Sequence, residues 1–140
     1  MRTSELFDLS GRVAVVTGGN GGIGRGIALG LAEAGASVAV FGRNEEKNRR
    51  VLSELKAIGI ASMAVSVDMT DRAGLEPALN SVESELGSVS ILVNNAGNVS
   101  LSGGVLNEKP EDWDCVIETQ LNSVFLFSKL AARSMISHKR

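Results

Sequence analysis

Residues 13–26, VAVVTGGNGGIGRG, decide the fold of this chain. A short apolar run stops at a cluster of glycines, and apolar residues then recur at helical spacing at Ile23, Ile27, Leu31 and Ala34. The pattern predicts a buried strand, a tight loop and the first turns of a helix. Glycines permit positive φ and remove Cβ atoms that would hold a ligand away, and free N–H groups at a helix start attract anions. The stretch therefore predicts a phosphate-binding loop.

The glycine spacing fits two dinucleotide-binding templates. Gly19, Gly21 and Gly24 read G-x-G-x-x-G between a predicted strand and a predicted helix, the context that this motif requires. A second template, T-G-x-x-x-G-x-G, begins at Thr17 and ends at Gly24. Neither Lys-Ser nor Lys-Thr follows, so the mononucleotide P-loop is not matched. The alternative, a plain glycine-rich turn, is disfavoured because strand and helix lie where the motif needs them.

Composition narrows the class of protein. The 140 residues, 44% hydrophobic and 21% charged, suit one globular domain over residues 1–140. A formal net charge of −2 gives no reason to expect nucleic acid or an anionic membrane as partner. No apolar run reaches membrane-spanning length, and residues 1–10 lack the apolar core of a signal peptide.

The single cysteine and the single histidine carry little chemistry in this interpretation. Cys115 cannot form an internal disulfide, which fits a reducing, cytoplasmic location, and its place beside Trp113 predicts buried packing. His138 lies in a polar tail, so neither a metal site nor a catalytic triad is predicted.

Beyond the glycine loop, strand and helix patterns alternate four times. The repeated alternation predicts an α/β fold, a Rossmann-like, doubly wound parallel sheet that ends after its fourth strand and the following long helix. Residues 1–10 are expected to tuck against the sheet, and a loop is expected over 97–104. The predicted strands are 12–17, 37–41, 61–67 and 90–94, and the predicted helices are 23–34, 45–58, 70–86 and 110–137.

Ligands in such folds lie at the carboxyl ends of the strands. After the second strand, Gly42 stands where an acid would bind the ribose hydroxyls of NAD, and the basic Arg43 follows. The hypothesis is NADP as cofactor, with NAD as the alternative. In that alternative Arg43 is a solvated residue at a helix start and Glu45 takes the ribose hydroxyl.

The last two strand ends carry polar and small residues. Asp68 is suited to accept a hydrogen bond from an adenine amino group, and Met69 to supply a backbone N–H and an apolar wall. Asp68 is equally suited to cap the next helix with Thr70. After the fourth strand, residues 94–97 read Asn-Asn-Ala-Gly, which lets the chain pass close to a ligand while amides tie neighbouring loops together.

The chain resembles the short-chain dehydrogenase/reductase family in the order and content of its motifs. These are the motif from Thr17 to Gly24, then Asp68, then residues 94–97, and finally residues 113–125. Within this family, the similarity is to 3-oxoacyl-carrier-protein reductases and gluconate-type sugar-acid dehydrogenases. The resemblance implies an NAD(P)-dependent oxidoreductase that moves hydride between nicotinamide and a small carbonyl or alcohol substrate. It also implies a homo-oligomer in which the long helix packs against a partner subunit.

The resemblance implies these cofactor-binding residues: Thr17, Gly18, Asn20, Gly21, Gly22, Ile23, Gly24, Arg43, Asp68, Met69, Asn95, Ala96 and Gly97. It places Gln120 where the family has a catalytic Asn that holds a water in a proton relay. The family's Ser and Tyr-x-x-x-Lys follow this helix, and these 140 residues contain no tyrosine. The general acid for the carbonyl oxygen is therefore not among them.

Two further expectations follow from this reading. The chain is expected to be the cofactor-binding part of a protein of roughly 250 residues, a usual size for one such α/β domain. By itself it is expected to be poorly soluble, because its fourth strand is a bare, apolar edge, or to bind cofactor weakly and turn nothing over. The alternatives are a non-catalytic dinucleotide-binding module, and a flavodoxin-like or methyltransferase domain, which the strand-end motifs disfavour.

Overall fold

The computed structural model describes residues 3–98 and 103–139 and forms a four-stranded parallel sheet. The strands are β1 (Val13–Thr17), β2 (Ser37–Gly42), β3 (Ser62–Ser66) and β4 (Ile91–Val93). Their order in the sheet is β3-β2-β1-β4 and every pair is parallel. The predicted α/β fold is confirmed, with β3 and β4 each shorter by a residue at both ends than the apolar pattern indicates.

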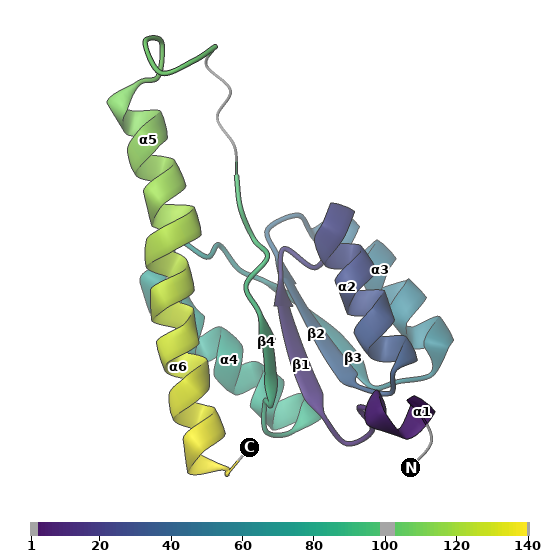
Figure 1. Ribbon diagram of the computed structural model, residues 1–140. Helices are drawn as coiled ribbons and strands as arrows, with labels where there is room; N and C mark the ends of the chain where they lie inside the picture. The colour runs from purple at the N-terminus through teal and green to yellow at the C-terminus, as the bar shows by residue number, and fades with distance from the viewer. Residues whose placement is uncertain (1–2, 99–102, 140) are drawn as a thin grey trace.

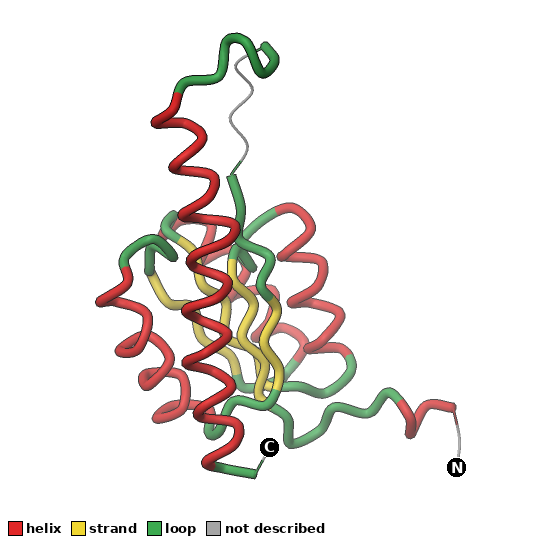
Figure 2. The backbone as a smooth tube through the Cα atoms, turned by 60° about the vertical axis from the view of Figure 1, so that its left-hand side comes forward, coloured by secondary structure: helices red, strands yellow, loops and turns green. Residues whose placement is uncertain are grey.

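Helices cover both faces of the sheet (Figures 1 and 2). On one face lie α2 (Gly22–Glu33) and α3 (Glu45–Ile58), and on the other lie α4 (Arg72–Leu86) and α6 (Ser123–Ser137). The helices begin and end where the sequence provides signals: Asn44 caps α3 through Lys47 N, and Gly59 ends it in the left-handed region at φ 93°.

The two faces bury separate apolar clusters because side chains alternate along each strand. Ala14 and Val16 of β1 face α2 and α3, whereas Val13 and Val15 face α4 and α6. The second cluster includes Phe41 of β2 and Phe127 of α6, whose ring centroids are 5.4 Å apart. The second face is thus covered by α4 and α6 within the described residues.

The strand register brings the functional loops to one edge. Thr17 pairs with Phe41, Val16 pairs with Val93, and Gly42 pairs with Ser66. The carboxyl ends of all four strands therefore lie side by side, and the loops that follow them surround a common space. The same topology leaves β4 at an edge of the described sheet.

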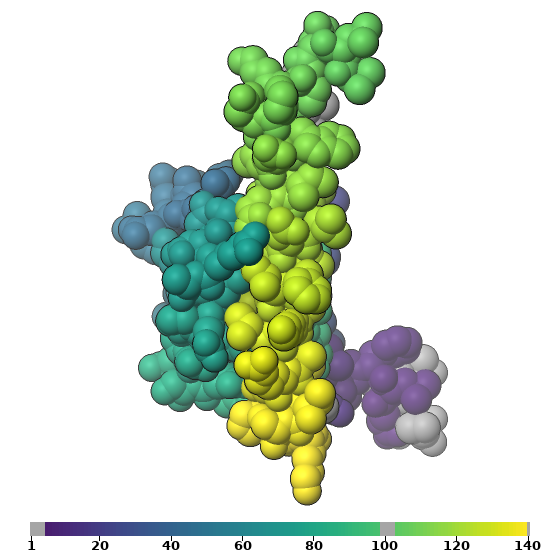
Figure 3. Space-filling model, turned by 90° about the vertical axis from the view of Figure 1, so that its left-hand side faces the viewer, coloured from purple at the N-terminus to yellow at the C-terminus, as the bar shows by residue number. Residues whose placement is uncertain are grey.

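The predicted long helix is a single column, but not a continuous α-helix. It begins as α5 (Pro110–Ile117), passes through a π-helical segment, η1 (Glu118–Asn122), and continues as α6. A π turn accommodates one extra residue, so a single 3.6-residue period does not describe the whole column. Figure 1 shows α5 standing beyond the strand ends, and Figure 3 shows the column as an unbroken ridge on one face of the molecule.

Two local expectations are wrong. Leu6 and Phe7, at the end of the short helix α1 (Thr3–Leu6), are 60% and 70% exposed, whereas Leu9 packs on the apolar cluster. Cys115 is exposed, because α5 stands beyond the ends of the strands. Part of the loop expected over 97–104, residues 99–102, lies outside the described residues. Within the described ranges, no helix is long and apolar enough to cross a membrane.

Candidate functional site

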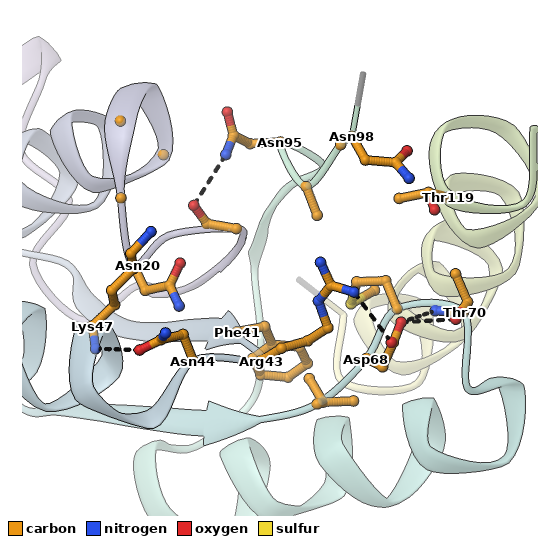
Figure 4. A pocket seen from close by; sticks show the side chains of 18 of the residues that line it. Asn20, Phe41, Arg43, Asn44, Lys47, Asp68, Thr70, Asn95, Asn98 and Thr119 are labelled. Atoms are coloured by element: carbon orange, nitrogen blue, oxygen red, sulfur yellow. Dashed lines mark hydrogen bonds and ion pairs between the residues drawn. The ribbon is translucent and has the colours of Figure 1, made fainter. Parts of the chain in front are cut away.

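A cavity of about 720 Å³ opens at the carboxyl edge of the sheet (Figure 4). Residues that follow all four strands contribute to it, together with two residues of the α5–η1 column, Cys115 and Thr119. The lining residues are Gly18, Asn20, Gly21, Gly22, Ile23, Gly24, Phe41, Arg43, Asn44, Lys47, Val67, Asp68, Met69, Thr70, Asn95, Ala96, Gly97, Asn98, Cys115 and Thr119.

The glycine loop forms one wall of the cavity in the conformation that its sequence predicts. Gly18 and Gly22 have φ of 64° and 51°, a region that side-chain-bearing residues rarely adopt. Gly21 is the N-cap of α2 and provides no side-chain acceptor for the first N–H groups of that helix, and no acidic residue lies in its first turn. These donors and the positive end of the helix dipole are therefore left for an anion.

Thr17 and Asn95 tie the glycine loop to the end of β4. The buried Thr17 hydroxyl accepts hydrogen bonds from the backbone N–H groups of Asn95 and Ala96, both at 3.0 Å. In return the Asn95 side-chain amide donates to the carbonyl oxygens of Thr17, at 3.1 Å, and Gly18, at 3.3 Å. Thr17 thus lies behind the wall of the cavity and holds two lining segments together.

A second tie joins the glycine loop to α3. Asn48, which is 5% exposed, accepts a hydrogen bond from Asn20 Nδ2 at 2.8 Å and donates to the Gly42 carbonyl oxygen at 2.9 Å. A Cβ atom on Gly42 would overlap the side-chain amide of Asn20 and lie 2.8 Å from Asn48 Oδ1. The last position of β2 is therefore glycine for a packing reason.

The charged residues predicted at the strand ends face each other. Arg43 Nη1 lies 3.6 Å from Asp68 Oδ2 (Figure 4). Asp68 Oδ1 accepts from the backbone N–H of Thr70 at 2.9 Å and from its hydroxyl at 2.8 Å. These bonds, and then Arg43, hold the pKa of Asp68 below its ordinary value, so it stays a carboxylate. The N-cap of α4 is Asp71, so Asp68 orders the turn before that helix and does not cap it.

Gln120 lies in η1 and outside the set of residues that line the cavity. Its side-chain amide donates to the backbone carbonyl oxygen of Asn98, which joins the π turn to the segment after β4. Two residues earlier, the bidentate ion pair of Arg72 with Glu118, at 2.9 and 3.0 Å, fixes the column to the start of α4. The catalytic role of Gln120 remains a prediction.

The structure therefore brings together every residue predicted to bind the cofactor except Thr17, which lies directly behind them. Asn44 and Lys47 were missed, although their place just after β2 was a usable signal. Cys115 and Thr119 gave no such signal, because only the packing of a distant helix brings them to the cavity. Among the described residues, no group of three His, Cys, Asp or Glu side chains is placed to hold a metal ion.

The parallel sheet, the helices on both faces and the glycine loop at the strand ends define a Rossmann-type α/β domain. The family model for short chain dehydrogenases matches residues 12–140. The chain belongs to the short-chain dehydrogenase/reductase family, as the motifs predicted.

Individual relatives are oxidoreductases of the same kind. Gluconate 5-dehydrogenase of Gluconobacter oxydans is 36% identical over 100% of this chain, which spans 54% of that protein. A metagenomic short-chain oxidoreductase in complex with NADP is 36% identical, with a TM-score of 0.88 over 95% of this chain and 60% of that chain. NAD⁺-bound xylitol dehydrogenase is 28% identical, with a TM-score of 0.89 over 93% of this chain and 50% of that chain. The chain thus spans about half the length of these relatives.

Proposed function

We propose that this chain is the NAD(P)-binding part of an oxidoreductase that moves hydride between nicotinamide and a small carbonyl or alcohol substrate. The observation that carries the proposal is the start of α2, where backbone N–H groups without a side-chain cap open into the cavity. A diphosphate satisfies such donors and is favoured by the helix dipole. The family of the chain supports the redox class.

The residues present fit a dinucleotide. Glycines at positions 18, 21, 22 and 24 leave the loop free of side chains where the diphosphate would lie. Asp68 stays ionised and faces the cavity as an acceptor for the adenine amino group, and Met69 and Ile23 supply apolar walls. Asn95, Ala96 and Gly97 would line the ribose. The bound cofactor supplies the hydride, and the protein's share is to bind and orient it.

We propose NADP as the preferred cofactor. Gly42 offers no carboxylate to ribose hydroxyls, and the next residue, Arg43, is a cation that lines the cavity. Arg43 accommodates a 2′-phosphate, whereas NAD recognition usually employs an acid here. Dissociation constants for NADP⁺ and NAD⁺, measured by calorimetry, test this preference, and equal or tighter binding of NAD⁺ overturns it.

The experiment for the function itself is a binding titration combined with a turnover assay. The 140 residues contain no tyrosine and so lack the expected general acid. NADPH fluorescence should change on mixing with the chain, while no carbonyl substrate is reduced. If NADPH fluorescence and calorimetry both show no binding, the proposal is wrong. Turnover by these residues alone would contradict the assignment of the missing acid.

A non-catalytic dinucleotide-binding module is the second candidate. Gln120 in place of the family's Asn favours it, and the missing tyrosine would count for it only if no further residues follow these 140. Sequencing the gene beyond codon 140 discriminates the two. A downstream Ser followed by Tyr-x-x-x-Lys supports the enzyme, and a stop codon supports the module. For either, a cytoplasmic location and a homo-oligomer are part of the proposal, and for the enzyme also a small-molecule substrate.

A further inference from the structure

The cavity holds an unbalanced positive charge. Of the described residues that line it, the charged ones are Arg43, Lys47 and Asp68. Arg43 and Asp68 are 3.6 Å apart and neutralise each other in part. No carboxylate of the described residues lies within ion-pair distance of Lys47. The ammonium of Lys47 is therefore the charge in this cavity that lacks a counter-ion.

Lys47 also lies at a position, the first turn of α3, where a cation does not stabilise the helix. It lies in the first turn of α3, which follows the N-cap Asn44, and its backbone N–H donates to Asn44 Oδ1 at 2.9 Å. A positive side chain beside the positive end of a helix dipole is unfavourable, whereas an anion there is favourable. The nearby Glu46 does not line the cavity, and its Oε1 atom lies 3.7 Å from Arg50 Nη2.

The residues beside Lys47 border the same cavity. Figure 4 shows its side chain beside Asn20 on one side of the cavity, and Arg43 beside Asp68 on the other. Asn20 is held by Asn48, and its amide occupies the space where a Cβ atom of Gly42 would lie. An anionic group bound between the two cations would meet Lys47 without first separating the Arg43–Asp68 pair.

We infer that Lys47 is a specificity-determining residue that binds the 2′-phosphate of an adenine nucleotide and discriminates it from a 2′-hydroxyl. The inference rests on the proposed function and assigns to Lys47 a larger share of the preference than to Arg43, which is already paired. An unpaired ammonium that meets a phosphate gains a charge-assisted hydrogen bond that a ribose hydroxyl does not match.

The test compares 2′,5′-ADP with 5′-AMP, which differ only in the 2′-phosphate, by calorimetry on the 140-residue chain. Lys47→Gln should weaken the binding of 2′,5′-ADP by about tenfold or more, which is the usual effect of losing a hydrogen bond to a charged group. It should change the affinity for 5′-AMP by less than about twofold. Lys47→Arg should keep most of the discrimination, because it keeps the charge. The salt dependence of 2′,5′-ADP binding should decrease in Lys47→Gln, since one ionic contact is lost.

Arg49→Gln is the matched control. It removes one positive charge from the same exposed stretch of α3 at a residue that does not line the cavity. It should leave the affinities for both nucleotides unchanged. Circular dichroism and the thermal midpoint verify that each variant is folded.

The outcomes separate the two proposals. If unaltered protein binds neither nucleotide, the proposed function fails and the inference fails with it. If it binds both and Lys47→Gln weakens both equally or neither, or Arg49→Gln matches Lys47→Gln, the inference alone is overturned. A selective loss in Lys47→Gln that Arg49→Gln does not reproduce supports it.

Discussion

Asn95, just after β4, donates its side-chain amide to the carbonyl oxygen of Gly18, just after β1, over 3.3 Å. The bond joins residues 77 positions apart in the chain and holds the glycine loop against the end of β4. The Cβ atom that any other residue would place at Gly24 would overlap both the Gly18 carbonyl oxygen and the Asn95 amide. Gly24 is thus required by contact with a distant strand end as well as by its own loop.

Gly24→Ala should therefore destabilise the fold and abolish nucleotide binding. We expect a loss of more than about 2 kcal/mol, because the backbone of the loop must shift to admit a methyl group. Gly26→Ala is the matched control, since a Cβ there meets nothing within 4 Å, and it should be neutral or stabilise the helix by up to about 1 kcal/mol. Urea unfolding measures both, and equal effects would contradict the packing argument.

Thr17→Val should destabilise the protein by about 1–3 kcal/mol, because it leaves two part-buried backbone N–H groups without an acceptor. Thr17→Ser keeps the hydroxyl and should restore most of the stability. Thermal unfolding measures both variants. If valine and serine behave alike, the loss comes from side-chain packing and the hydrogen-bond argument is wrong.

Acid should weaken the contact that fixes the long column to α4. The hydrogen bonds from Arg72 and then Asn122 lower the pKa of Glu118. The unfolded carboxyl, with a pKa of about 4.3, therefore binds protons before the folded one does. The stabilising effect is complete above that pH and is lost as the pH falls through the lower, folded pKa.

The measurement is the thermal midpoint between about pH 3 and 6 for unaltered protein and Glu118→Gln. The midpoint difference should be largest at the upper end and shrink on acidification. Glu85→Gln, at an exposed carboxylate on α4, is the control and should follow the unaltered protein. A difference that stays constant over the range would exclude the ion pair as its source.

The 140 residues alone should self-associate through the column and the free edge of β4. Leu121 and Phe125, one turn apart, are 60% and 63% exposed, and contiguous exposed apolar surface marks an interaction site. Phe125→Ser should lower the average mass in analytical ultracentrifugation. Phe7→Ser removes a ring of similar exposure at the far end of the molecule and should not. A monodisperse monomer would contradict the expectation of a partner surface.

Local sequence signals were enough for the fold and for most of the site. The apolar run before Thr17 and the glycines after it specify a strand, a loop and a helix, because each depends on neighbouring residues. Parallel connections then place all strand ends at one edge, so Arg43, Asp68 and Asn95 were predicted to meet although they lie far apart in sequence.

Only the tertiary structure decided which of these residues line the cavity and which support their neighbours. The burial of Thr17, the exposure of Cys115 and the pairing of Arg43 with Asp68 depend on segments that come from elsewhere in the chain. The π turn at Glu118–Asn122 depends in the same way on contacts to α4 and to the segment after β4. Hydrophobic periodicity reports which face of an element is buried. It does not report which distant atom lies against that face, and this decides whether a polar side chain binds a ligand or supports its neighbour.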